Sequence, residues 1–280
     1  PDTSLLTKTG FTPIIQWIGK EIEIWNGNEW TTVTPFKTSD NEEVFKVTFS
    51  DGSDLTCTSY HEFILSDKKR KQLKDLKIGD KLAKFTYPLL QSKINRFNAR
   101  SEIFYTQGFF SGDGTIAIEE GRNTRYFIDL YGEKIKLLPN LIVKEYGEYD
   151  KVNNRIRTEV NSLLVHSKDF VPNSVDFSVE NRLNWLAGIL DSDGTLNDSG
   201  GSLAISSIDK EFLLNIKSLL ITLGVRSTIG INKEEQEKET AKKQNNWRSS
   251  SLGSCLRGQF ANRLFSGEFE VIHDQRTKEV

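Results

Sequence analysis

Two stretches of this chain, eighty residues apart, end an apolar run in the same way. Residues 105–116 read YTQGFFSGDGTI, and residues 185–196 read WLAGILDSDGTL. A carboxylate at a helix C-terminus is unfavourable unless a nearby cation neutralises it, because the helix dipole already leaves partial negative charge there. An Asp-Gly pair alone is also typical of a β-turn, as in SDGS at residues 50–53. The repeated layout instead predicts two helices that end in Asp113 and Asp193, with a cation near both.

Small residues line one face of each predicted helix. Gly108 and Gly112 are four apart, as are Gly188 and Ser192, and residues at this spacing share a helix face. Such stripes let two backbones approach more closely than the usual 8–10 Å or so. If the stripes face each other, the two aspartates lie side by side, where charges about 5 Å apart repel by roughly 3 kcal/mol. Magnesium between them would relieve the repulsion and share its ligands with a phosphate, which indicates a metal-dependent phosphodiesterase centre.

The length of 280 residues predicts two modules. Residues 1–95 read as short strands and turns, and Asn26-Gly27 favours a tight hairpin turn in which both central residues have positive φ. From residue 96 the pattern is mixed, which makes the fold class α+β. A helix–hairpin unit occurs twice, and residues 208–224 predict an amphipathic helix with Asp209 as N-cap and Gly224 at its end. The second part is therefore expected to have pseudo-two-fold symmetry.

Composition narrows the function classes. The chain has 37 basic and 39 acidic residues and a pI near 6.1, which counts mildly against nucleic-acid binding. Cys57 and Cys255 are too few for a disulfide framework or a zinc site. No apolar run is long enough to span a membrane, and Pro1 does not open a signal peptide. These features predict an intracellular protein in the cytoplasm without a membrane partner, excised from a longer chain.

The residues from 186 to 194, LAGILDSDG, resemble the LAGLIDADG signature, and TQGFFSGDG at 106–114 is similar to a weaker first copy. Two copies in one chain resemble a single-chain LAGLIDADG homing endonuclease. The resemblance implies an αββαββα domain over residues 96–269, which acts as a monomer on a long asymmetric site in double-stranded DNA with Mg²⁺ or Mn²⁺. It also implies metal ligation by the carboxylates of Asp113 and Asp193 and by the backbone carbonyls of Gly112 and Ser192.

Further positions are assigned by the same resemblance. SKDFVPNSV at 167–175 resembles the lysine-then-Ile/Val-Pro segment of intein endonucleases, so Lys168 is a candidate basic residue beside the scissile phosphate; a surface lysine is the alternative. Ser111 replaces the first aspartate of the signature at a position expected to pack. The family places a β-saddle along the major groove, and each candidate DNA-facing residue could also be a solvated loop residue. These candidates are Arg122, Asn123, Arg125, Lys242, Lys243, Asn245 and Arg248.

The first module resembles the Hint fold of inteins, an all-β horseshoe. DTSLLTKTGFTPI at 2–14 is similar to the segment after an intein's first residue, and 55–65 contains Thr58 and His61 in the spacing of the TxxH element that polarises the first scissile peptide bond. Residues 270–280 resemble the start of the C-terminal Hint segment. A Cys or Ser nucleophile before Pro1 and a terminal His-Asn pair are missing, which predicts a trimmed chain or a split intein with a C-terminal intein fragment as partner.

Three hypotheses follow. The first is a bifunctional intein, a splicing module that carries a DNA endonuclease. The second is a splicing intein whose endonuclease has decayed to a structural insert; the near-neutral charge and the acidic pair Glu119-Glu120 favour it. The third is a maturase-like DNA-binding module without cleavage, against which the retention of both aspartates argues.

Overall fold

The N-terminal part of the molecule consists of short antiparallel strands. The structure, a computed structural model, describes residues 3–39, 41–50, 53–92, 101–118, 123–196, 203–231, 254–258 and 268–273. Up to residue 92, the described chain contains no α-helix and only two 3₁₀ turns, Ile14–Trp17 and Leu73–Asp75. A four-stranded sheet in the order β2-β1-β3-β4 is followed by the hairpins β5-β6 and β7-β8. Their bounds are β1 Ser4–Thr7, β2 Gly10–Pro13, β3 Ile22–Trp25, β4 Trp30–Val33, β5 Val44–Thr48, β6 Asp54–Thr58, β7 Glu62–Ile64 and β8 Arg70–Gln72.

The hairpin predicted around Asn26-Gly27 forms, but the prediction of its turn was wrong. Four residues, 26–29, link β3 to β4. Gly27 has a φ of +101°, whereas Asn26 is not among the described residues with positive φ. The side chain of Asn26 instead accepts hydrogen bonds from the backbone N–H groups of Asn28 (2.9 Å) and Glu29 (3.0 Å). This Asx geometry satisfies the longer loop, so a two-residue turn is not needed.

The second part of the chain contains two helix–sheet units in sequence. In the first, α1 leads into a sheet in the order β11-β12-β10-β9; in the second, α2 leads into a sheet in the order β13-β14-β16-β15-β17. The first unit comprises α1 Ser101–Asp113, β9 Gly114–Ala117, β10 Arg125–Tyr131, η3 Gly132–Asn140, β11 Tyr149–Asp150 and β12 Arg155–Glu159. The second comprises α2 Val179–Asp193, β13 Gly194–Leu196, β14 Leu203–Ser207, α3 Lys210–Thr222, β15 Arg226–Ile231, β16 Ser254–Gly258 and β17 Glu268–His273. The mixed α and β composition agrees with the predicted α+β class.

One element of the predicted αββαββα order differs between the units. The helical segment after the hairpin is an α-helix in the second unit but a 3₁₀ helix, η3, in the first. Pro139 lies inside η3, where it cannot donate a backbone hydrogen bond, and Gly132 opens the segment with a φ of +54°. These two residues in a nine-residue stretch disfavour a continuous α-helix.

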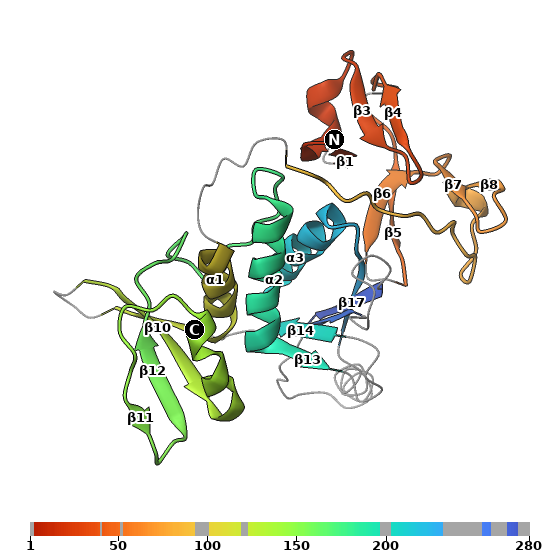
Figure 1. Ribbon diagram of the computed structural model, residues 1–280. Coiled ribbons are helices and arrows are strands. Elements are labelled where there is room, and N and C mark those ends of the chain that lie inside the picture. The colour runs from red at the N-terminus through yellow and green to blue at the C-terminus, as the bar shows by residue number, and fades with distance from the viewer. Residues whose placement is uncertain are drawn as a thin grey trace, which may run out of the picture.

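The two motif helices lie side by side between the sheets (Figure 1). One cluster of buried side chains fills the space between α1 and the first sheet, and includes Phe109, Phe110, Ile128 and Leu130. A second, larger cluster joins α2, α3 and the second sheet. Each sheet therefore buries one face against helices.

The predicted helix at residues 208–224 is confirmed, with its ends as expected. α3 begins after Asp209, whose Oδ1 accepts hydrogen bonds from the backbone N–H groups of Glu211 (2.8 Å) and Phe212 (3.1 Å). Gly224 follows with a φ of +78°, the left-handed conformation that ends helices. The apolar face of α3 packs into the larger hydrophobic cluster.

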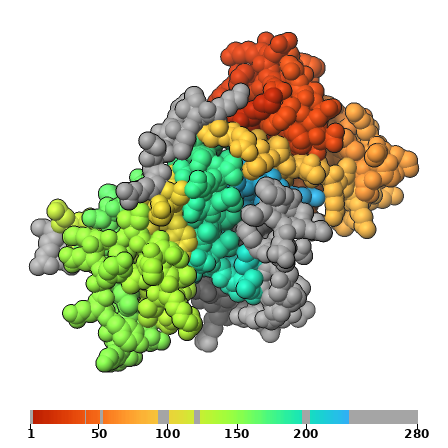
Figure 2. Space-filling model, in the orientation of Figure 1, coloured from red at the N-terminus to blue at the C-terminus, as the bar shows by residue number. Residues whose placement is uncertain are grey.

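A buried arginine, Arg182, links the segment around Leu90, which follows the N-terminal strands, to the helices. Figure 2 shows the N-terminal strands gathered at one end of the molecule, with the following segment reaching across to the helices. Leu90 N–H donates to the carbonyl of Thr222 (2.9 Å), and the fully buried Arg182 donates to the same carbonyl (3.0 Å), to Thr222 Oγ1 (2.8 Å) and to the carbonyl of Leu90. Burial lowers the pKa of Arg182 to about 10. Because this value is still above neutral pH, Arg182 remains charged, and the acceptors of its hydrogen bonds are carbonyl and hydroxyl oxygens.

The last described strand belongs to the second sheet. β17 pairs in parallel with β15 and antiparallel with β16. The predicted boundary at residue 270, where the chain was expected to return to the N-terminal module, falls inside this strand; residues 274–280 lie outside the described residues. In the part of the chain that the structure describes, no helix combines the length and apolarity needed to cross a bilayer.

Candidate metal centre

The two motif helices touch through their glycines. A Cβ added to Gly108 would lie 2.0 Å from the carbonyl oxygen of Trp185. At Gly188 it would lie 2.0 Å from the carbonyl oxygen of Tyr105 and 2.7 Å from the backbone nitrogen of Phe109. Since these neighbours are backbone atoms, a side chain at either position would have to push the helices apart. The small stripes therefore face each other, which is the condition under which the sequence places the two aspartates side by side.

The same contact brings the two helix ends together. A Cβ on Gly112 would lie 2.1 Å from Ser192 Oγ and 2.9 Å from Asp193 Oδ2. The carboxylate of Asp193 thus lies against the residue that precedes Asp113. Both aspartates are the last residues of their helices, α1 and α2. The predicted juxtaposition of two carboxylates is present.

The environment of Asp193 disfavours its negative charge. Burial is the main cause that raises the pKa of Asp193, and the nearby charge of Asp113 raises it further. Lys134 and Lys168 act in the opposite direction but do not cancel the rise. A divalent cation beside Asp193 would reverse this balance, because it favours the charged form.

Two lysines approach the helix ends. Lys134 Nζ donates to Asp113 Oδ2 (2.6 Å) and to the carbonyl of Ser192 (2.5 Å). Lys168 Nζ donates to the carbonyl of Gly112 (2.6 Å). The carbonyl before each aspartate therefore accepts a hydrogen bond from an ammonium group, which offsets the negative end of each helix dipole. Lys168 lies where the sequence placed it, beside the paired aspartates; its catalytic role stays a prediction.

Lys134 was missed by the sequence analysis. It lies in the first turn of η3, directly after β10. A signal for it exists in hindsight: Lys134 precedes Pro139-Asn140 much as Lys168 precedes Pro172-Asn173. The lysine segment thus occurs twice, and both copies lie between α1 and α2, the first after β10 and the second after β12. The pattern was recognised only in its second copy.

Gln107 fixes the segment that carries Lys168. Its side chain lies on the fully buried face of α1 and donates through Nε2 to the carbonyl of Ser167 (3.1 Å). Its Oε1 accepts from the backbone N–H of Val165 (3.0 Å). Because both ends of the amide are used, the loop at 165–168 is held against α1 and Lys168 is directed to Gly112.

A second contact between the helices occurs on one side only. Tyr105 Oη donates to Asp191 Oδ2 at 2.7 Å. Burial and this carboxylate both raise the pKa of Tyr105 well above its ordinary range. Trp185 and Ser111 occupy the corresponding positions of the other copy, and Ser111 Oγ donates instead to the carbonyl of Gln107 (3.1 Å).

The donor set fits a hard divalent cation. The carboxylates of Asp113 and Asp193 and the carbonyls of Gly112 and Ser192 are all oxygen donors, the type that Mg²⁺ and Mn²⁺ prefer. No group of three or more His, Cys, Asp or Glu side chains that could hold a metal occurs among the described residues. An ion at the helix ends would therefore complete its shell with water or phosphate oxygens, as Mg²⁺ commonly does.

The candidates of the N-terminal module lie in one turn. Thr58 ends β6, and its carbonyl accepts a hydrogen bond from the backbone N–H of His61 at 3.1 Å. The His61 ring packs edge-on against Phe63, with 5.1 Å between centroids. The neighbouring Cys57 is buried, which raises the pKa of its thiol.

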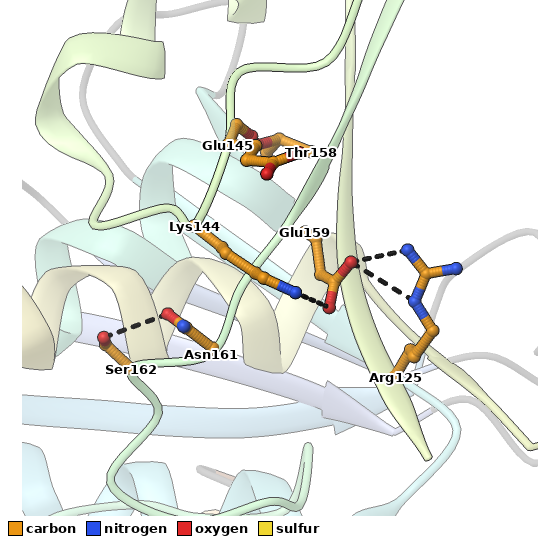
Figure 3. A network of polar contacts seen from close by, with 7 residues as sticks. All are labelled: Arg125, Lys144, Glu145, Thr158, Glu159, Asn161 and Ser162. Atoms are coloured by element: carbon orange, nitrogen blue, oxygen red, sulfur yellow. Dashed lines mark hydrogen bonds and ion pairs between the residues drawn. The ribbon is translucent and has the colours of Figure 1, made fainter. Parts of the chain in front are cut away.

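The DNA-facing candidates are only partly described. Asn123 is exposed ahead of β10, and Arg125, the first residue of β10, donates to Glu159 (Figure 3). The other candidates lie outside the described residues: Arg122, Lys242, Lys243, Asn245 and Arg248.

Comparison with known protein families identifies the second helix–sheet unit. Residues 180–262 match the family model described as a LAGLIDADG-like domain. The chain contains a LAGLIDADG-like domain. The match includes most of α2 and Asp193, and the first copy of the motif lies before it in the chain.

Two relatives that match about four fifths of the chain are named for different enzymes. The chain is 36% identical over 253 residues to the ribonucleoside-diphosphate reductase large subunit of Invertebrate iridescent virus 6, which covers 82% of this chain and 25% of that protein. It is 24% identical over 256 residues to the ATP-dependent DNA helicase Hel308 of Methanocaldococcus jannaschii, with 81% and 21% covered. The chain thus spans about a quarter of the length of these relatives. A solved structure of I-DmoI in complex with DNA and Mn is 18% identical, with a TM-score of 0.32, and covers 54% of this chain and 98% of that one.

Proposed function

We propose that the LAGLIDADG-like domain is a metal-dependent endonuclease that cuts double-stranded DNA. The observation that carries this proposal is the convergence of Asp113 and Asp193 at the touching ends of α1 and α2. A fold gains nothing in stability from two carboxylates placed together at the negative ends of two helices. The arrangement is useful if cations bind there with a phosphate.

The proposed roles follow from the contacts. Asp113, Asp193 and the carbonyls of Gly112 and Ser192 would hold Mg²⁺ or Mn²⁺, which when bound supplies Lewis-acid polarisation of a phosphodiester and activation of water. Lys134 and Lys168 donate to the oxygens of this centre, and in this proposal their ammonium groups would stabilise negative charge on a phosphate. The outer faces of the two sheets would contact the DNA, and one chain with two motif copies would act as a monomer.

Plasmid cleavage tests this proposal. The substrate is a plasmid with Mg²⁺ present, and it carries the gene that contains the coding sequence of this chain after that coding sequence has been removed. Asp113→Asn and Asp193→Asn should each abolish double-strand cleavage, while both variants still bind the same DNA in Ca²⁺, because the amide keeps the shape but removes the charge that holds the metal. Wild-type cleavage by either variant would refute the assignment.

We further propose that the endonuclease is carried by an intein. A reductase subunit and a DNA helicase perform different reactions, yet this chain is similar to about a quarter of each. A segment shared by two such different enzymes is more simply explained as an insertion than as part of the catalytic machinery of either enzyme. In this proposal residues 1–95 are a Hint-type splicing module with Thr58 and His61 at the first splice site, residues 96–269 are the endonuclease, and residues 270–280 begin the C-terminal Hint segment.

Splicing can be tested separately. The chain is placed between two tagged proteins, preceded by a cysteine and followed by a peptide that ends in His-Asn, either fused or supplied as a C-terminal intein fragment. Ligation of the tagged proteins is expected, and His61→Ala should suppress N-terminal cleavage by about 10²–10⁴-fold if it acts on the scissile amide. Asp193→Asn should splice normally. Normal splicing by His61→Ala would refute the role of this histidine.

A further inference from the structure

The outer face of the first sheet is unusually rich in charge. Along β10, Ile128 and Leu130 are fully buried against α1, so the alternate residues Arg125, Phe127 and Asp129 point to the opposite face. The register of β12 adds three residues to this face: Glu159 opposite Phe127, Arg157 opposite Asp129, and Arg155 opposite Tyr131. We call this surface the arginine face.

An aromatic ring organises two of its arginines. The guanidinium carbon of Arg157 lies 4.4 Å from the centroid of Phe127, and that of Arg125 lies 4.8 Å from it. A guanidinium packed against an aromatic ring loses freedom to rotate but keeps its N–H donors at the edge. Phe127 therefore acts as a common platform for both side chains.

Carboxylates hold the same arginines from the side. Arg125 donates through Nε (3.2 Å) and Nη2 (2.5 Å) to Glu159 Oε2, and Lys144 Nζ donates to Glu159 Oε1 at 3.3 Å (Figure 3). Arg157 Nη1 lies 3.7 Å from Asp129 Oδ2. Asp129 and Glu159 are mostly buried, with 14% and 19% of their side chains exposed, whereas 52% of Arg125 and 39% of Arg157 are exposed.

Arg157 forms an ion pair with Asp129 but no hydrogen bond to it. At 3.7 Å its contact with Asp129 is an ion pair beyond hydrogen-bond distance, and Asp129 Oδ1 is buried without a hydrogen-bond partner among the described residues. The N–H donors of Arg157 are thus oriented by charge and by Phe127, yet none is used by an acceptor in the described part of the chain. A base edge with two acceptors would complete them.

We propose that Asp129 and Glu159 are positioning residues for base recognition, which hold Arg157 and Arg125 over Phe127 so that each reads a guanine in the major groove. This inference rests on the proposed function. Arginine binds guanine through two parallel hydrogen bonds to O6 and N7, and this requires a fixed guanidinium. The carboxylates would lower affinity for phosphate in return for this selectivity, since the face carries three acidic and four basic side chains. Those side chains are Asp129, Asp150, Glu159, Arg125, Lys144, Arg155 and Arg157.

The test separates selectivity from affinity. The full chain and its variants select from a pool of duplexes with a randomised centre, in Ca²⁺ so that binding is measured without cleavage. Wild type is expected to enrich guanine at defined positions. Asp129→Asn and Glu159→Gln should each lower the preference for guanine at one position by about 5- to 100-fold, with unchanged or tighter overall binding. Each should also steepen the dependence of log K on log salt by about 0.9, because one more phosphate is neutralised.

Controls keep the outcomes distinct. Glu23→Gln removes a carboxylate of a surface ion pair with Lys8 in the N-terminal sheet and should leave guanine preference unchanged. Asp129→Glu should restore part of the preference, which a merely structural role would not require. If Asp129→Asn does not fold, Glu159→Gln carries the test. Full guanine preference in the variants, or a wild type that binds duplexes without preferring guanine, would overturn the inference, whereas a wild type that retains no duplex at all would count against the proposed function itself.

Discussion

At Gly108 and Gly188 the two motif helices make the same contact, since an added Cβ in either would lie 2.0 Å from a carbonyl oxygen of the other helix. At their ends the helices differ. Asp113 accepts a hydrogen bond from Lys134, whereas among the described residues no side-chain partner is seen for Asp193, whose pKa is raised by burial and by Asp113. The contrast teaches that repeated small residues determine the packing of the helices, while residues outside the repeat determine the electrostatics at their ends.

The largest effect is expected from a substitution that disrupts the close contact between α1 and α2. Gly188→Val should destabilise the protein by about 3 kcal/mol or more, because the new side chain meets backbone atoms of Tyr105 and Phe109 that cannot move alone. Gly108→Val should behave alike. Chemical denaturation measures the change, and Ala187→Val, at an exposed position of the same helix, is the control with an expected loss below about 1 kcal/mol. Similar losses for Ala187 and Gly188 would disprove the close contact.

The second prediction concerns the inequality of the aspartates in the metal-free protein. Asp193→Asn should raise the melting temperature at neutral pH by a few degrees, because the buried charge and its repulsion from Asp113 are removed. Asp113→Asn should raise it less or lower it, because the ion pair with Lys134 is lost. Thermal unfolding in EDTA measures both. Equal shifts would show that the two ends are equivalent.

The same comparison has a pH dependence of known sign. The folded-state pKa of Asp193 lies above its unfolded value, so the folded protein binds this proton more tightly. The penalty of the ionised group is present above the folded-state pKa and fades as the pH falls through it. The advantage of Asp193→Asn over wild type should therefore shrink on acidification. A gap that widens at low pH would contradict the cause given for Asp193.

A smaller effect is expected from the lysines. Lys134 contacts Asp113 and the carbonyl of Ser192, but Lys168 contacts only the carbonyl of Gly112. In double-mutant cycles, Lys134→Met and Asp113→Asn should couple by about 0.5–1 kcal/mol, whereas Lys168→Met and Asp113→Asn should be additive. Denaturation of the wild type, the three single variants and the two double variants measures the coupling. Equal coupling for both lysines would remove the distinction between the helix ends.

An effect of similar size is expected for the contact found on one side only. Tyr105→Phe should cost about 1 kcal/mol, because it removes the hydrogen bond to Asp191 while it keeps the ring in place. Tyr149→Phe is the matched control: Tyr149 donates to Asn154 in an exposed turn, where its loss should be nearly neutral. Urea denaturation compares the two. A neutral Tyr105→Phe would mean that this contact does not hold the helices together.

Several features of the fold could be predicted from short stretches of the sequence. The α3 helix and both of its ends follow from periodicity, an aspartate cap and a glycine stop, all within seventeen residues of sequence. The stripe of small residues on each helix also follows, because four-residue spacing places them on one face, but only the structure shows that the two stripes face each other. The turn at Asn26 was misjudged, since a side-chain oxygen satisfied a longer loop. The Hint-type module remains a prediction, because the short strands of residues 3–92 are compatible with it but do not distinguish it.

By itself the sequence determined that two helices would end in aspartates, that glycines would let them touch, and that the chain holds a LAGLIDADG-like domain, because each is encoded by residues close together in the chain. Only the tertiary structure decided that Lys134 pairs with Asp113, while no side-chain partner of Asp193 is seen among the described residues. Lys134 lies 21 residues from Asp113 and 58 from Ser192, and Arg182 reaches Leu90 across 92 residues. Such contacts depend on how whole elements pack, so no local periodicity records them, and electrostatics follow that packing.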